Sequence, residues 1–159
     1  MTGHGASTLP QAAQAFQGQP AGLVSRSVAA VVDAAVVAGA LVAAYLGLAA
    51  AMFAVNPRGF HFPSSMGLLS IAAACTLSTA YLTIGWWIAG RTYGCAVMGL
   101  RVRSRRDGNI GFLAALVRAL VCTFFPIGLA WCAVDTRARG VQDLVVRSQV
   151  IYDWRHRER

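Results

Sequence analysis

Long apolar runs separated by short polar clusters set the pattern of this chain. The first run covers about residues 27–55 and ends at a turn cluster, Asn56-Pro57-Arg58-Gly59, and the second covers about residues 66–89. Each run is long enough for a helix that crosses roughly 30 Å of hydrocarbon. Trp86 and Trp87 close the second run, as an aromatic belt does at a membrane surface. The pattern predicts two full transmembrane helices.

A third apolar run, residues 112–134, is interrupted near its middle by Phe125-Pro126-Ile127-Gly128. A proline followed closely by a glycine breaks or kinks a helix. Each half of the run holds about a dozen residues, too few to cross the bilayer, which favours a re-entrant or hairpin segment. An ordinary Pro-kinked third span is the alternative. The predicted fold class is therefore an all-α integral membrane protein, with two full transmembrane helices plus a third Pro-broken hydrophobic segment.

The remaining segments are polar. Residues 1–22 contain no charged side chain and are expected to form a disordered cytoplasmic tail. Within residues 91–111, the stretch 100–103 alternates apolar with charged residues, which predicts a partly extended segment at the lipid headgroups. Residues 141–154 alternate more weakly and are expected to be extended at the surface. The basic C-terminal tail is expected at 153–159. One membrane domain, 23–152, is predicted between the tails.

Composition places the chain in a membrane. Of its 159 residues, 57% are hydrophobic and 13% charged, whereas soluble domains carry about 25% charged residues. The net charge of +8 comes from arginines that flank the apolar runs, so membrane topology and lipid headgroups explain it better than nucleic acid does. If the third run returns to its starting side, Arg58 alone faces outward. We therefore expect a bacterial inner-membrane protein with both termini in the cytoplasm.

Two ionisable residues in the apolar runs are candidates for function. Asp33 lies two helical turns after Arg26, on the same face and about 10 Å away along the axis. A carboxylate near the bilayer centre costs about 3 kcal/mol, so Asp33 should have a partner, and Arg118 in the third run is the obvious one. The predicted Asp33–Arg118 pair either fixes the helices in register or lets Asp33 bind a proton or cation during transport.

Other features narrow the function. Asp143 precedes Arg147 by four residues, as Asp135 precedes Arg139, which predicts solvated ion pairs. The chain has no Ser/His/Asp set, Cys/His pair or phosphate-binding loop, and its four cysteines lack metal-ligand spacing. We therefore expect no enzyme, metal or cofactor. A small residue recurs at every fourth position from 35 to 51, which favours close packing against the second helix or another copy of the chain.

These motifs resemble those of the RDD family of membrane proteins, named for one arginine and two aspartates. The run RSVAAVVD (26–33) resembles the Arg and Asp of the family's first helix, and GRTYGCAVMGLRVRSRRDG (90–108) resembles its GRT-x-GK…G-x-RV…DG segment. LVRAL (116–120) carries the arginine that commonly follows. RARGVQDLVVRSQVI (137–151) is similar to the closing segment, which makes Asp143 the second aspartate. The similarity covers residues 22–152 in order.

The chain departs from the family pattern at three positions. Cys95 stands where the family usually has Lys, Gln142 where it often has His, and Ser148 in place of the closing Thr. The missing lysine removes a contact to a headgroup or anion. Arg91, Arg101 and Arg103 remain as the candidate headgroup contacts.

Two functions are compatible with the resemblance. Transport has been suggested for the family, cation/proton exchange for some members, and others resemble accessory proteins. We expect either an accessory subunit of a larger membrane assembly, such as a lipid or solute transporter, or a small oligomeric cation/proton transporter that uses Asp33. The expected partners are membrane lipid and further copies or a larger membrane complex, without nucleic acid.

Overall fold

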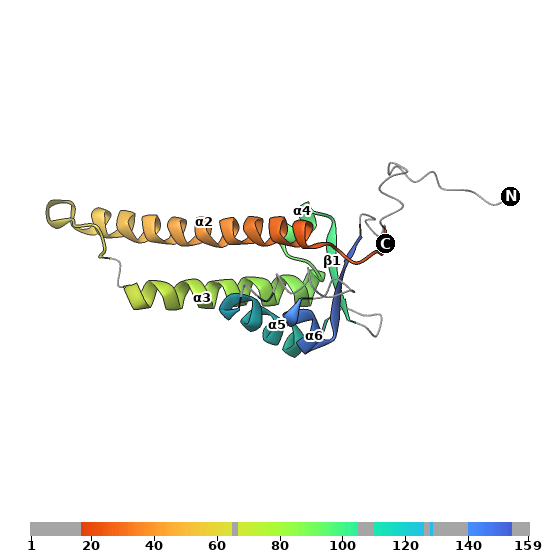
Figure 1. The fold of residues 1–159 in the computed structure, drawn as a ribbon. Coiled ribbons are helices and arrows are strands. Elements are labelled where there is room, and N and C mark those ends of the chain that lie inside the picture. The colour runs from red at the N-terminus through yellow and green to blue at the C-terminus, as the bar shows by residue number, and fades with distance from the viewer. Residues whose placement is uncertain (1–16, 65–66, 105–109, 126–127, 129–139, 154–159) are drawn as a thin grey trace.

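The structure is a computed structural model, and it describes residues 17–64, 67–104, 110–125, 128 and 140–153. Two long helices dominate it and lie side by side (Figure 1). Helix α2 spans Leu23–Val55, and helix α3 spans Gly67–Ile84 and continues into a π-helical turn, η2, at Gly85–Ala89. Both are long and apolar enough to cross a membrane, and most of their surface is exposed. These helices correspond to the two predicted spans.

The link between the two helices is a short turn at the far end of the molecule. Asn56 ends α2, and its side chain accepts a hydrogen bond from Gly59 N at 3.1 Å, which closes the 3-10 turn η1 at Pro57–Gly59. Asparagine before proline favours such a turn, because proline cannot continue the helix. The cluster at 56–59 thus ends the first helix where the sequence predicted.

The other elements gather where α2 begins and α3 ends, and we call this region the head (Figure 1). It contains helices α4 (Tyr93–Val97), α5 (Phe112–Phe124) and α6 (Val141–Val146), and strands β1 (Leu100–Ser104) and β2 (Ser148–Tyr152). The strands pair antiparallel, with Val102 opposite Val150, and both of these side chains are buried. The fold is therefore not purely α-helical. The alternation at 100–103 and 148–152 buries one face of each strand, which a helix could not do.

The chain before α2 also belongs to the head. Gly18 N donates to Tyr152 O at 2.8 Å and Ala21 N donates to Val150 O at 2.9 Å, while the Ala21 side chain is fully buried. Residues 17–22, expected to be part of a tail, instead lie along β2 and satisfy its free edge. Backbone hydrogen bonds hold them there, and composition carries no signal for such contacts. Residues 1–16 and 154–159, the rest of the two expected tails, lie outside the described residues.

Helix α5 occupies the first half of the third apolar run and packs beside α3 (Figure 1). It ends at Phe124, where Phe125 N donates to Val121 O, directly before the predicted break. Ala115, Arg118 and Ala119 form its buried face. Most of the second half lies outside the described residues, as do Asp135 and Arg139 after it, so the choice between a re-entrant and a kinked segment stays a prediction.

Candidate functional site

Asp143 is the centre of a buried charged cluster that joins three helices. Its Oδ2 accepts hydrogen bonds from Arg26 Nη1 of α2 and from Gly140 N, and its Oδ1 accepts one from Arg118 Nη1 of α5. Ser148 Oγ accepts from Arg118 Nη1 at 2.7 Å and lies 3.4 Å from Asp143 Oδ1. The Asp143 and Ser148 residues are each 1% exposed. We call these five residues the arginine cluster.

The electrostatics of the arginine cluster keep Asp143 ionised. Burial raises the pKa of this carboxyl, but the guanidinium groups of Arg118 and Arg26 lower it by more, so its pKa lies below the usual range. The expected solvated pair with Arg147 is wrong, because Arg147 adopts a left-handed conformation after α6 and is exposed. Asp143 instead points into the head, where Arg26 and Arg118, distant in the sequence, neutralise its charge.

Further contacts fix the two arginines in place. Arg26 Nε donates to Ala21 O at 3.2 Å, and the guanidinium carbon of Arg118 lies 4.7 Å from the centre of the Trp86 ring, a cation–π contact. Arg26 and Arg118 are only 5% and 3% exposed. Segments before α2, in η2 and in α5 therefore meet at one charged core.

Asp33 has a separate set of partners. Its Oδ1 accepts from Tyr81 Oη at 2.8 Å and from Gly94 N at 2.7 Å, and its Oδ2 accepts from Thr92 Oγ1 at 2.6 Å. Thr92 is also the N-cap of α4 and accepts from Cys95 N at 3.3 Å. The carboxylate thus satisfies free N–H and O–H groups at the first turn of α4. We call Asp33, Tyr81, Thr92 and Gly94 the Asp33 site.

The segment GRTYG forms this site because each of its parts meets a geometric requirement. Gly90 has φ +69°, which ends η2 in a left-handed turn that glycine adopts readily. At Gly94, an added Cβ would lie 2.1 Å from Ala29 O and 2.9 Å from Asp33 Cγ, so only glycine lets α4 touch α2. Thr92, between them, supplies the hydroxyl.

The predicted Asp33–Arg118 pair is therefore wrong. Arg118 binds Asp143, and Asp33 is satisfied by neutral donors. A carboxylate needs hydrogen-bond donors to remain stable when buried, and a helix N-terminus with two hydroxyl groups supplies them without a counter-charge. All four candidate ionisable residues are buried, although Asp143 was expected in a solvated ion pair, and they form two sites instead of one.

Several residues of these two sites could not be predicted as site residues from the sequence. Tyr81 belongs to an apolar run, Trp86 was expected only in an aromatic belt, and Ser148 was noted only in place of the family's closing Thr. Thr92 and Gly94 could be found only through the GRTYG motif. Of the headgroup candidates, Arg101 bonds Asp153 at 3.4 Å, whereas Arg91 and Arg103 are half-buried.

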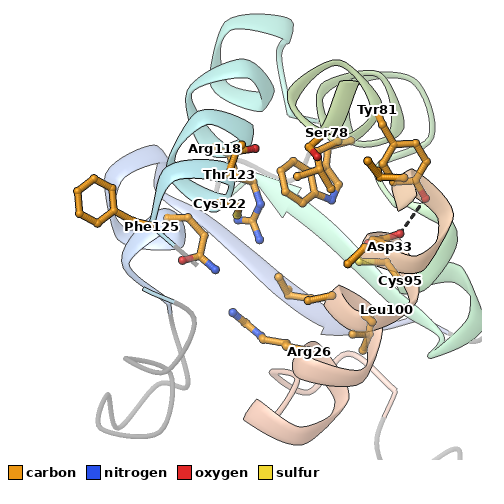
Figure 2. A pocket seen from close by; sticks show the side chains of 18 residues that line it. Arg26, Asp33, Ser78, Tyr81, Cys95, Leu100, Arg118, Cys122, Thr123 and Phe125 are labelled. Atoms are coloured by element: carbon orange, nitrogen blue, oxygen red, sulfur yellow. Dashed lines mark hydrogen bonds between the residues drawn. The ribbon is translucent and has the colours of Figure 1, made fainter. Parts of the chain in front are cut away.

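A cavity of about 320 Å³ lies between the two sites (Figure 2). Arg26 and Arg118 line it on one side, and Asp33 lines it on the other, turned toward Tyr81. Small apolar side chains of α2, including Ala30 and Ala34, form much of its wall. Two of the three residues that depart from the family pattern, Cys95 and Gln142, line the cavity. The third, Ser148, belongs to the arginine cluster.

Comparison with known proteins gives one match. The model of the RDD family matches residues 20–147. The chain belongs to the RDD family. No curated protein and no solved structure matches it. Family membership and the two long apolar helices together make it a membrane protein.

The match includes the Asp33 site and all of the arginine cluster except Ser148. Arg26, Asp33, Arg118 and Asp143 all lie within the matched residues, as does the GRTYG segment. The matched region begins at Pro20, inside the segment that lies along β2. In this RDD chain, the arginine and the two aspartates for which the family is named are all contact points of the head.

Proposed function

We propose that this RDD chain is a non-enzymatic, multi-pass membrane protein that acts as an accessory subunit of a larger membrane assembly, such as a lipid or solute transporter. One observation carries the proposal: every ionisable residue of the candidate set is engaged in holding the head together. Asp143 joins α2, α5 and α6, and Asp33 joins α2, α3 and α4. Such contacts stabilise a fixed shape, which an accessory subunit requires.

The position of Asp33 along α2 supports a structural role. Residues 34–55 and 67–89 contain no Asp, Glu, Lys, Arg or His, and a helix of 22 residues is about 33 Å long, enough to cross the hydrocarbon. Asp33 then lies at the membrane boundary, beside the head. We propose that the head faces the cytoplasm of a bacterial cell, at the inner membrane, with Arg58 on the outer side, in line with the positive-inside rule.

The alternative, a cation/proton transporter that uses Asp33, has less support. A relay across the bilayer requires ionisable or hydrated groups along the path, and the crossing stretches of α2 and α3 have no Asp, Glu, Lys, Arg or His. Asp33 itself already accepts hydrogen bonds from Tyr81, Thr92 and Gly94. A copy of the chain would have to release these donors before Asp33 could bind a cation.

Proton-coupled Na⁺ and K⁺ flux in proteoliposomes distinguishes the two functions. We expect no flux above that of empty liposomes from folded wild-type protein. We expect Asp33→Asn to lower the amount of folded protein, because an amide has one acceptor oxygen where the carboxylate has two. Wild-type flux that disappears in a well-folded Asp33→Asn variant would overturn the accessory role and establish the transporter.

The accessory role itself predicts an assembly. Solubilised gently from its native membrane, the chain should migrate on a native gel with a complex larger than its purified oligomer. Deleting the chain should reduce the amount of that complex. Migration as the purified oligomer, with no complex affected by the deletion, would contradict the proposal.

A further inference from the structure

Three buried hydrogen-bond donors without a partner belong to side chains that line one cavity. Among the described residues, Arg26 Nη2, Arg118 Nε and Trp86 Nε1 have no hydrogen-bond acceptor, and all three residues line the cavity between the arginine cluster and the Asp33 site. Their exposed fractions are 5%, 3% and 5%. Buried donors are almost always satisfied in proteins. Gln142 also lines the cavity and its Oε1 has no partner, but one amide oxygen cannot satisfy three donors, so the set indicates a missing acceptor.

The charge balance calls for an acceptor with negative charge. Two guanidinium groups share the single carboxylate of Asp143, which leaves one positive charge in excess. The oxygens of Asp143 are already occupied, since Gly140 N and Ser148 Oγ also contact them. Asp33, the other acid at the cavity, lies on the opposite side and is turned toward Tyr81 (Figure 2). It cannot neutralise the arginines from there.

The shape of the cavity is suited to the head of an amphiphile. Its lining extends along α2 from Arg26 to Val37, eleven residues or about 16 Å of helix. The polar donors lie at the Arg26 end, and the lining residues of α2 farther from Arg26 include Ala34 and Val37. A volume of about 320 Å³ is at the small end of ligand pockets and fits a headgroup with part of a chain.

We propose that this cavity binds a phosphate group, whose oxygens accept from Arg26 Nη2, Arg118 Nε and Trp86 Nε1. Phosphate matches the planar donor edge of arginine and supplies several acceptors at once. A membrane phospholipid and free phosphate both carry this group. The proposed site involves only the arginine cluster and the cavity, so its test is independent of the accessory role.

Binding to purified wild-type protein in a non-ionic detergent tests the proposal with three probes. Dioctanoyl-phosphatidylglycerol should bind saturably and raise the Tm, whereas dioctanoylglycerol, with the same chains and no phosphate, should do neither. Binding of inorganic phosphate as well would identify a free-phosphate site; its absence would identify a lipid site. Equal binding of dioctanoylglycerol, or no binding of either phosphate probe, would overturn the proposal.

A pair of neighbouring tryptophans provides the matched variants. Trp86→Phe keeps a ring under Arg118 but removes the Nε1 donor, and it should weaken phosphatidylglycerol binding about tenfold. Trp87→Phe makes the same change at a side chain that is 47% exposed and packs on Phe112, and it should leave binding unchanged. Equal effects of the two variants would refute the site. The three wild-type probes decide the matter even if Trp86→Phe does not fold.

Discussion

Replacing Asp143 with asparagine tests whether the arginine cluster holds the head together. The side chain keeps its shape and loses its charge, so Arg26 and Arg118 are left buried without a counter-ion. One amide oxygen replaces two carboxylate oxygens, and the amide NH₂ would face a guanidinium group. Removing one partner of a buried ion pair costs about 3–5 kcal/mol, because the charge that remains is not compensated. We expect the free energy of unfolding to fall by this amount.

Asp153→Asn is the matched control. Asp153 also pairs with an arginine, Arg101, at 3.4 Å, but the two side chains are 13% and 26% exposed. This pair is only partly buried, and ion pairs at a protein surface contribute about 0–1 kcal/mol. The same chemical change should therefore cost far less at Asp153 than at Asp143.

The assay is unfolding in mixed micelles, followed by circular dichroism as the detergent is exchanged for dodecyl sulfate. The double variant Asp143→Asn with Arg26→Met removes one of the two unpaired guanidinium groups. Its loss of unfolding free energy should therefore be smaller than the sum of the losses in the two single variants. The reasoning is refuted if Asp143→Asn and Asp153→Asn lower the free energy of unfolding by amounts that differ by less than about 1 kcal/mol, the upper value for a surface ion pair.

Three further predictions concern the head. Gly94→Ala should cost at least about 2 kcal/mol of stability in the same assay, because its Cβ would clash with Ala29 O, whereas Gly39→Ala, with open space around it, should be neutral. The lowered pKa of Asp143 means that its contribution is complete above the unfolded value of about 3.9 and is lost as the pH falls through the folded value; acid titration of stability should show this loss in wild type and not in Asp143→Asn. Burial raises the pKa of the Cys95 thiol, so at pH 8 iodoacetamide should label it more slowly than free cysteine, as peptide mass spectrometry can measure.

Much of the fold follows from periodicity and run length. The apolar runs at 27–55 and 66–89 predict the two long helices because their length and composition are sufficient in themselves. The alternation at 100–103 predicts an extended segment for the same local reason, but not its pairing with β2 or the burial of Leu100 and Val102. The position of residues 17–22 does not follow, because their hydrogen bonds to β2 involve the backbone, which every residue shares. The amino-acid composition of a segment therefore does not indicate which distant backbone groups it contacts.

The candidate sites were predicted only in part, for an electrostatic reason. Pairing Asp33 with Arg118 assumes that a buried carboxylate needs an opposite charge nearby. The structure satisfies Asp33 with Tyr81 Oη, Thr92 Oγ1 and Gly94 N instead. Donors of this kind are common along the chain, so charge alone cannot select among them. The close approach of α4 to α2, which Gly94 permits, determines which donors reach Asp33.

The same geometry accounts for a carboxylate inside an apolar run. Helix α2 has 33 residues, or about 50 Å, whereas the hydrocarbon needs only about 20 residues. On the proposed placement, its first ten or so residues belong to the head, and both Arg26 and Asp33 lie among them. Ala29 packs against the head in this part of the helix, whereas Val24 and Val31 are exposed. On the proposed placement, the run beyond Asp33 is apolar because it faces lipid. An acid at this boundary can tie the membrane helices to the head without entering the hydrocarbon, which is why its substitution should affect folding before it affects flux.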